Sequence, residues 1–295
     1  MVKITPVQKN FVTKIEDIDL SCTLNRHDLE IITNAFEIFG VVIFQSQSIS
    51  IEQQIAFSRR FGPLEPSVRR HRKRAISNVY ISDISNVGPD GTIMDEASEA
   101  MSYNRGNQLW HSDSSFKKIP SKASLLYALE TPPSGGETEF CDMRAAWDSL
   151  ESQMQIKIES LTVEHSLAYS RGIMGYNAEK HFSKAEKIEA SPVLQPLVRE
   201  SDISGRKSLY LGSHASQIMG MKEKESRTLL DTLLTHASQK QFVHVHAWSP
   251  GDLIMWDNRC INHRGRPWSS QKYRRVMRRT TVGGEGFDEE AALAI

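Results

Sequence analysis

The first sixty positions carry two hydrophobic patterns of different period. Across residues 25–39, apolar side chains recur three and four positions apart, as on one face of a helix, and the asparagine that opens this range can cap it. A glycine ends the pattern, and the apolar run Val41–Phe44 then predicts a buried strand. Ser50 and Gln53 match a capping box, which predicts a second helix from Ser50 to Arg60.

The second half of the chain alternates between strand and helix patterns. Strands are predicted at 124–129, 242–248, 253–256 and 276–282, and helices at 142–161 and 222–238. The turn Ser249–Asp252 separates two of these strands, which we expect to form a hairpin. Short strands with helices inserted between them predict a mainly β protein, either an antiparallel barrel or a jelly roll decorated by helices.

The segment from Pro66 to Asn107 shows neither period. It is polar and irregular, and Gly88–Gly91 predicts a turn. It also contains the strongest charge cluster of the chain, the basic run from Arg69 to Arg74. Such a run could bind nucleic acid, line the mouth of a site for an anionic substrate, or be solvated surface.

The composition excludes several classes of protein. Lys and Arg number 36, as do Asp and Glu, so no net charge attracts nucleic acid or an anionic membrane. No apolar run approaches the roughly 18 residues of a membrane helix, and the N-terminus lacks the apolar stretch of a signal peptide. Three separated cysteines argue against a disulfide framework or a thiolate zinc site, although Cys260 lies close enough to His263 to be considered as a ligand. We expect a cytoplasmic globular protein.

The sharpest chemical feature is the sequence Trp110–Ser114, which contains His111 and Asp113. In an extended segment, residues two apart point to the same face, so an imidazole and a carboxylate are offered together. His263, in a polar loop after a buried-looking strand, could supply a third ligand. Two histidines and one carboxylate on one face of an octahedron leave three positions open, which suits a non-haem iron(II) that binds a co-substrate and oxygen.

Three further side chains could bind anions beside this metal. Arg275 lies on an expected strand after His263, where its guanidinium can pair with the far carboxylate of a bidentate keto acid. Thr138 follows a glycine turn and could donate a hydrogen bond to the same carboxylate. Strand alternation places Arg275 and Arg279 on one face, with Met277 between them.

At this point the sequence resembles a known family, the taurine dioxygenase (TauD/TfdA) family of iron(II)- and 2-oxoglutarate-dependent oxygenases. It is most similar to the branch that acts on phenoxyacetate herbicides. The resemblance covers nearly the whole chain and rests on four blocks in the same order: Gln54–Pro63, Asn107–Phe116, Pro133–Phe140, and Trp256–Arg259 with His263.

The resemblance implies a fold, a reaction and a set of site residues. The fold would be a double-stranded β-helix, a cupin-like jelly roll, formed by residues 1–295 as a single domain, with 66–107 as a substrate-lid or pocket segment. His111, Asp113 and His263 would hold iron(II), and Thr138 and Arg275 would bind 2-oxoglutarate. Arg279, the Asn107 side chain and the Ser114 backbone NH would contact the substrate. The reaction would use O2 to hydroxylate a C–H bond of a small anionic molecule and convert 2-oxoglutarate to succinate and carbon dioxide.

Several alternatives stay open at this point. The substrate could be a carboxylate such as an aryloxyalkanoate, a sulfonate, or, with the same chemistry, a purine or secondary metabolite. A different class would be a non-catalytic cupin-like module that binds metal, or a partner through the basic run. The pair His244 and His246 could bind metal on its own, Trp110 could shape the site, and Asp257 could orient the ligand loop. A nucleic-acid partner or a membrane is not expected, and a homo-oligomer is left open.

Overall fold

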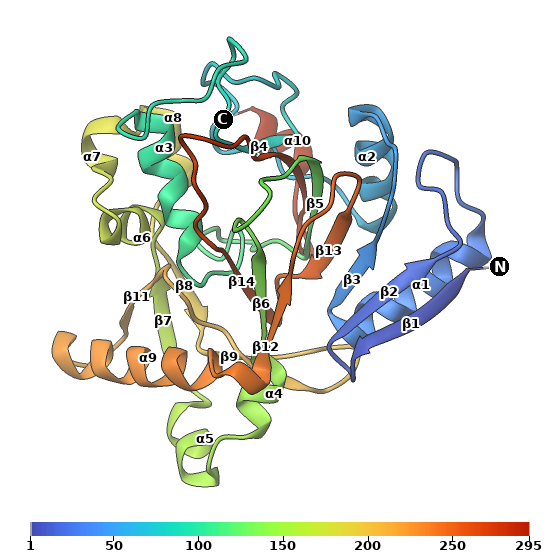
Figure 1. Cartoon of the computed structure of the whole chain (residues 1–295). Coiled ribbons are helices and arrows are strands. Elements are labelled where there is room, and N and C mark those ends of the chain that lie inside the picture. The colour runs from blue at the N-terminus through green and yellow to red at the C-terminus, as the bar shows by residue number, and fades with distance from the viewer. Residues whose placement is uncertain (1, 295) are drawn as a thin grey trace.

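The computed structural model describes residues 2–294 (Figure 1). The strands are β1 (Lys3–Gln8), β2 (Val12–Glu16), β3 (Val41–Phe44), β4 (Ser82–Ser85), β5 (Ala123–Glu130), β6 (Thr138–Asp142), β7 (Thr162–His165), β8 (Val193–Pro196), β9 (Val198–Glu200), β10 (Lys207–Leu209), β11 (Ala215–Ile218), β12 (Val243–His246), β13 (Leu253–Asp257), β14 (Ile261–Gly265) and β15 (Val276–Val282). The helices are α1 (Arg26–Phe39), α2 (Ile51–Ser58), α3 (Glu99–Asn104), α4 (Met143–Asp148), α5 (Ser152–Ile158), α6 (Leu167–Ile173), α7 (Ala178–His181), α8 (Lys184–Glu189), α9 (Glu223–Ala237) and α10 (Glu289–Leu293). Three short 3-10 turns are η1 (Arg59–Phe61), η2 (Arg105–Gln108) and η3 (Lys240–Phe242).

Two facing β-sheets form the centre of the molecule. The larger has the order β1-β2-β3-β13-β5-β15-β4, and the smaller has the order β12-β6-β14. Pairing is antiparallel in both sheets except between β2 and β3. Strands far apart in sequence are neighbours in each sheet, which confirms the predicted jelly roll with inserted helices.

The core is divided into layers by the larger sheet. On β13, Leu253 and Met255 point toward α1 and α2, which cover the outer face of this sheet (Figure 1). Ile254 and Trp256 point the other way and pack between the two sheets, together with Phe140 of β6. Because successive strand residues face opposite sides, both faces of β13 are buried. This arrangement packs Trp256 between the sheets, with its ring centroid 4.5 Å from that of His263.

The local capping signals are confirmed. The Asn25 side chain accepts a hydrogen bond from the Asp28 backbone NH at the start of α1, and Gly40 ends that helix in the left-handed conformation (φ 79°). Ser50 and Gln53 form both bonds of a capping box at the start of α2. Helix α9 likewise lies where the leucine pattern predicts it.

The predicted hairpin of residues 242–248 and 253–256 is wrong. β12 pairs with β6 in the smaller sheet, whereas β13 pairs with β3 and β5 in the larger one. The turn between them therefore carries the chain from one sheet to the other. Its carboxylate, Asp252, accepts hydrogen bonds from the Ser249 backbone NH and from His246 Nε2, both at 3.0 Å. The local pattern identified both strands but not their partners.

Two other expectations are corrected. The single helix predicted at 142–161 is two helices, α4 and α5, because Glu151 adopts an extended conformation (φ −60°, ψ 141°) between them. The segment 66–107 is not irregular throughout, since it contains β4, which pairs with β15, and the short helix α3. None of the helices in residues 2–294 has the length and hydropathy needed to span a bilayer.

Candidate metal centre

His111 and His263 are brought together by the backbone. An isolated antiparallel bridge joins the two residues, with NH-to-carbonyl distances of 3.0 and 2.8 Å. Their imidazole centroids lie 4.2 Å apart, and Trp256 packs 4.5 Å from the ring of His263. His111 Nδ1 donates to the Leu109 carbonyl at 2.7 Å, so its Nε2 is the nitrogen with a free lone pair.

Asp113 completes the group from the same segment as His111. One carboxylate oxygen lies 3.8 Å from His111 Nε2 and the other lies 3.6 Å from His263 Nε2. The next residue, Ser114, adopts the left-handed conformation (φ 54°) and turns the chain away. One potential ligand atom from each of the three residues lies within 4.8 Å of the others, and all three residues are buried. Within residues 2–294, no other group of three His, Cys, Asp or Glu residues places its potential ligand atoms this close together.

Burial and neighbouring charge put these groups in the protonation states that a metal requires. Burial lowers the pKa of His111 to about 4 and that of His263 well below its ordinary value, so both rings are neutral near pH 7. Burial alone would raise the pKa of Asp113. The neighbouring Arg279 guanidinium and the two imidazoles act against it and hold that pKa below its ordinary value.

The donor set fits iron(II). Two neutral imidazoles and one carboxylate match the facial triad of non-haem iron oxygenases, and the residues around them leave the remaining positions open toward two cavities. His263 Nδ1 is buried without a hydrogen-bond partner in the described residues, so its ring is held mainly by the packing of Trp256 and Phe140. Cys260 does not join the group of clustered ligand atoms. Burial and Asp257 also raise the pKa of its thiol.

Asn258 and Ser124 support the carboxylate and were missed at the sequence level. Asn258 Oδ1 accepts from the Asp113 backbone NH at 3.2 Å and from the Trp256 indole at 3.0 Å. Its Nδ2 donates to the Ser124 hydroxyl, which in turn donates to Asp113 Oδ2 at 2.7 Å. One amide therefore fixes both the backbone and, through Ser124, the carboxylate of Asp113. Only the position of Asn258 beside the predicted ligand loop pointed toward this role.

Replacing Asn258 with alanine is expected to weaken metal binding by about 10- to 100-fold, because partners that orient metal ligands typically contribute that much. Titration of Mn(II) into the metal-free protein measures the effect. Ser124→Ala should weaken binding less, since the bond from the Asp113 backbone NH to Asn258 remains. Wild-type Mn(II) affinity in Asn258→Ala would contradict this role.

A cavity of about 240 Å³ opens on one side of the triad. It is lined by His111, His263, Thr138, Arg275, Leu126, Trp256 and Trp268, among others. Thr138 Oγ1 accepts from the Trp248 indole at 2.9 Å, which leaves its own hydroxyl proton free to donate. Arg275 is 5% exposed and its Nε donates to the Gly136 carbonyl at 3.0 Å. Within residues 2–294 no carboxylate lies within 4.0 Å of its nitrogen atoms, so the cavity contains a buried cation suited to an anionic ligand.

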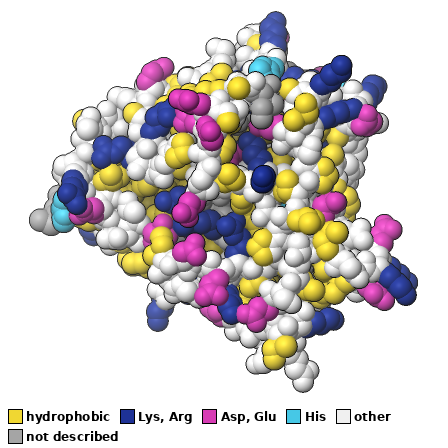
Figure 2. Space-filling model, turned by 180° about the vertical axis from the view of Figure 1, so that it is seen from behind, with side chains coloured by type: hydrophobic (Ala, Val, Ile, Leu, Met, Phe, Trp, Pro, Cys, Tyr) yellow, Lys and Arg dark blue, Asp and Glu magenta, His cyan; other side chains and the backbone are white. Residues whose placement is uncertain are grey.

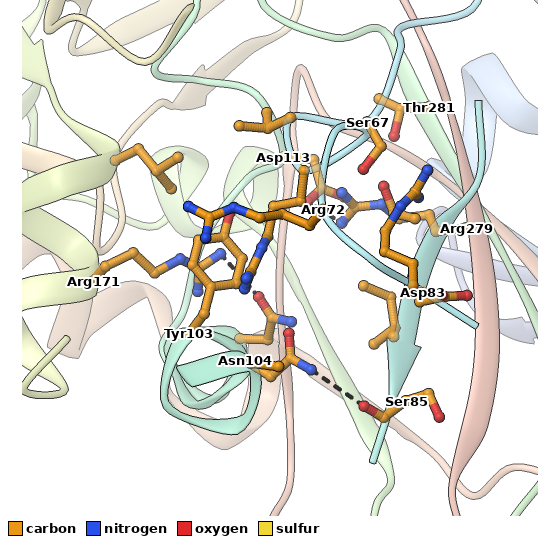
Figure 3. A pocket seen from close by; sticks show the side chains of 18 of the residues that line it. Ser67, Arg72, Asp83, Ser85, Tyr103, Asn104, Asp113, Arg171, Arg279 and Thr281 are labelled. Carbon is orange, nitrogen blue, oxygen red and sulfur yellow. Dashed lines mark hydrogen bonds and ion pairs between the residues drawn. The ribbon is translucent and has the colours of Figure 1, made fainter. Parts of the chain in front are cut away.

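A second cavity, of about 140 Å³, opens on the other side (Figure 3). Arg279 lines both cavities, and its guanidinium contacts the carboxylate of Asp113. Asn107 also lines both cavities. Ser114 lines only the second cavity, and the Ser114 hydroxyl donates to Glu65. The expected alternation is confirmed, because Arg278 of β15 bonds to Gln54 on the face opposite Arg279, and Arg274, which precedes β15, pairs with Glu130 outside both cavities.

The basic run from Arg69 to Arg74 is held in internal interactions. Arg69 pairs with Glu99 (2.5 Å), Arg70 with Glu189 (2.7 Å) and Arg72 with Glu186 (2.6 Å). Glu99 lies on α3 within the segment 66–107, so its pair with Arg69 is internal to that segment. Glu186 and Glu189 lie on α8, so Arg70 and Arg72 fasten the segment to a distant part of the chain. Basic, acidic and apolar side chains are mixed over the face seen in Figure 2. Because several residues of the run line the second cavity, the structure favours a role at the mouth of the site over solvated surface.

The remaining sequence-level candidates have structural roles. His246 is buried and bonded to Asp252, and neither it nor His244 belongs to a cluster of potential metal ligands. Trp110 packs in the core beside β6 and carries the Arg264 guanidinium 4.6 Å from its ring. Asp257 accepts from the Arg259 backbone and side chain, so it shapes the loop rather than a metal ligand.

Comparison with known proteins covers nearly the whole chain. The family model described as "Taurine catabolism dioxygenase TauD, TfdA family" matches residues 3–281. The alpha-ketoglutarate-dependent 2,4-dichlorophenoxyacetate dioxygenase of Cupriavidus pinatubonensis is 43% identical over 279 residues, which cover 94% of this chain and 96% of that protein. The (S)-phenoxypropionate/alpha-ketoglutarate-dioxygenase of Sphingobium herbicidovorans is 36% identical, with 86% and 85% covered. The crystal structure of AAD-2 in complex with Mn(II) and N-oxalylglycine matches with a TM-score of 0.91 at 42% identity, covering 96% of this chain and 98% of that one.

Proposed function

The chain belongs to the TauD, TfdA family of dioxygenases, and from this premise we propose that it hydroxylates a small aryloxyalkanoate carboxylate. It is an iron(II)- and 2-oxoglutarate-dependent dioxygenase. The substrate class is supported by one observation above all: a cavity lined by arginines and by a group of apolar side chains adjoins the triad on the side away from Arg275.

We assign His111, Asp113 and His263 as the iron ligands. Iron(II) bound there supplies the oxidative chemistry that couples decarboxylation of 2-oxoglutarate to hydroxylation of a C–H bond. The protein's part is to present two neutral imidazoles and an ionised carboxylate without rearrangement. The backbone bridge between the histidines and the Asn258–Ser124 bonds to Asp113 already hold these side chains in place.

We assign the larger cavity to 2-oxoglutarate. Its far carboxylate would accept from Arg275 and from the Thr138 hydroxyl, which line the same cavity as the metal ligands. A guanidinium offers two parallel donors, so it fixes the direction of the co-substrate as well as its charge. Binding would also relieve the unfavourable burial of an unpaired cation.

We assign the second cavity to the primary substrate. Its apolar residues, such as Ile84, Val87, Phe116 and Leu167, suit an aromatic ring. Arg279 reaches from this wall to Asp113, so a carboxylate held by Arg279 lies beside the metal ligands. The Asn107 side chain and the Ser114 backbone NH would supply further contacts, and residues 66–107 would close the cavity. Because the arginines in the basic run are paired internally, we infer a small molecule rather than nucleic acid as the partner.

The test is succinate release with iron(II) and 2-oxoglutarate against a panel of phenoxyacetates, alkyl sulfonates, alkyl sulfates and purines, with His111→Ala as the blank. We expect turnover that depends on a phenoxyacetate. Turnover with a sulfonate or purine but no phenoxyacetate would replace the proposed substrate class. Absence of succinate release with every compound would favour a non-catalytic metal-binding module.

Replacing Arg279 with glutamine is expected to lower kcat/KM for a phenoxyacetate by about 100-fold, because a desolvated charged contact to the substrate is lost. The KM for 2-oxoglutarate should change far less. Arg274→Gln is the matched control, since that arginine stands on the same segment but pairs with Glu130 at the surface. An unchanged KM for the phenoxyacetate in Arg279→Gln, with normal Mn(II) binding, would refute the assignment.

A further inference from the structure

Arg171 is a buried arginine that the assigned functions do not use. It lies on α6 and is 7% exposed, and it lines the second cavity. Its Nη2 donates to Asn107 Oδ1 at 3.1 Å, and its guanidinium carbon lies 4.2 Å from the centre of the Tyr103 ring. Its Nε is buried without a hydrogen-bond partner in the described residues. A guanidinium has five N–H donors, so most of this group's hydrogen-bonding capacity is unused.

No acidic side chain neutralises Arg171. Within residues 2–294, none of its nitrogen atoms has a carboxylate oxygen within 4.0 Å. Two other buried arginines contrast with it, because Arg70 pairs with Glu189 and Arg144 pairs with Asp142. An uncompensated buried charge is strongly unfavourable, so a group retained in this state is suited to an anion from outside the chain.

Gly106 makes room for this guanidinium. A Cβ atom at position 106 would lie 1.9 Å from Arg171 Nη1 and 2.8 Å from its guanidinium carbon. The backbone at Gly106 does not have a positive φ, so conformation alone does not call for glycine there. Glycine at position 106 therefore leaves the space that the guanidinium of Arg171 occupies.

Arg171 and Arg279 enter the cavity from different sides. Figure 3 shows Arg171 extending from α6 on one side and Arg279 from β15 on the other, with the lining side chains between them. In this structure Arg279 is paired with Asp113, whereas Arg171 has no ionic partner. Arg69, Arg72, Lys73, Arg74 and Lys117 also line the cavity, and three of them (Arg69, Arg72 and Lys117) pair with glutamates. Arg171 differs from them in being buried without a carboxylate within 4.0 Å in the described residues.

We propose that Arg171 is a second anion-binding residue of the substrate cavity, which selects substrates that carry a second anionic group remote from the carboxylate at Arg279. The proposal rests on the assignment of this cavity to the substrate. A dianion with an aromatic spacer satisfies both arginines and the apolar walls at once. A monoanionic phenoxyacetate leaves Arg171 without a partner.

The test compares phenoxyacetate with 4-carboxyphenoxyacetate, which differs only in a second carboxylate at the far end of the ring. Equilibrium binding is measured without oxygen on enzyme loaded with iron(II) and 2-oxoglutarate, and succinate release is measured with oxygen. Wild-type enzyme is expected to bind the dianion about 10- to 100-fold more tightly, as charge-assisted hydrogen bonds allow. Arg171→Gln should remove this preference and weaken dianion binding more than phenoxyacetate binding, since the single carboxylate of phenoxyacetate lies at Arg279.

Three further variants separate recognition from a structural role. Arg171→Lys keeps the charge and should retain most of the preference. Gly106→Ala displaces the guanidinium without removing it and should reduce the preference as Arg171→Gln does. Arg227→Gln removes a half-buried arginine that pairs with Asp231 and lines neither cavity, and it should leave the preference unchanged. Wild-type affinity for 2-oxoglutarate in each variant verifies that the protein is folded.

The outcomes distinguish this proposal from the proposed function. If wild-type enzyme shows no preference for the dianion, or if Arg171→Gln keeps the preference, the second anion site is refuted. If neither compound is turned over but binding of the dianion still depends on Arg171, the site stands and the proposed reaction on aryloxyalkanoates fails. Turnover of phenoxyacetate without any dependence of dianion binding on Arg171 retains the proposed function and overturns the inference.

Discussion

Replacing His263 with alanine is expected to reduce succinate release by more than about a thousandfold, because residues that merely orient metal ligands already contribute 10- to 100-fold. His263 supplies one of only two imidazoles in the triad, and its Nε2 faces Asp113 at 3.6 Å. Its loss leaves two ligands, both on the His111–Asp113 segment. Mn(II) titration should therefore show weakened metal binding together with the lost turnover.

His236→Ala is the control for this result. That histidine bonds to Ser149 and to the Ala146 carbonyl and lines neither of the two cavities at the triad, so its loss should leave turnover near the wild-type level. The buried ring of His263 also contributes to packing, so thermal unfolding of both variants is measured alongside. Normal succinate release by a folded His263→Ala protein would rule out the proposed ligand set.

Replacing Arg275 with glutamine is expected to weaken 2-oxoglutarate binding by about 100- to 1000-fold, as for loss of a buried charged contact to a ligand. The same change should raise the unfolding temperature of the protein without 2-oxoglutarate, since it removes a cation that has no carboxylate partner. Burial lowers the pKa of Arg275 to about 10, which reflects that same desolvation, yet the group stays charged at neutral pH. Binding titrations and thermal unfolding measure the two effects.

Two further variants serve as comparisons for Arg275→Gln. Arg274→Gln removes a neighbouring surface arginine and should change neither 2-oxoglutarate affinity nor the unfolding temperature by much. Thr138→Val should weaken 2-oxoglutarate binding by a smaller factor, because it removes a single neutral donor. An Arg275→Gln protein that binds 2-oxoglutarate normally would show that the co-substrate lies elsewhere.

Features carried by short stretches of sequence could be predicted. The caps at Asn25 and Ser50, the buried strand Val41–Phe44 and the placement of Arg275 and Arg279 on one face all depend on neighbours within a few residues. The likeness of four sequence blocks to a known family supplied the fold and the reaction. The three proposed ligands fall together because two of them share an extended segment and the third lies in a recognisable block.

Features set by distant contacts could not be predicted. Residues 242–256 have the pattern of a hairpin, but tertiary packing assigns the two strands to different sheets. Asn258 acts on Asp113 across 145 positions of sequence, and Arg171 meets Asn107 across 64. The basic run looked like exposed charge because its acidic partners lie up to 119 residues away. No local pattern contains these pairings.

The bridge between His111 and His263 has a consequence for biosynthesis. These residues lie 152 positions apart (263 − 111), and the NH-to-carbonyl bonds that align their rings form only when β14 is in place. Such long-range pairings close late, because the entropy of a large loop must be overcome first. A ribosome-bound chain that has not yet emerged through its last strands therefore holds no complete triad. We therefore expect iron(II) to bind at these residues only after β14 has paired with its neighbours.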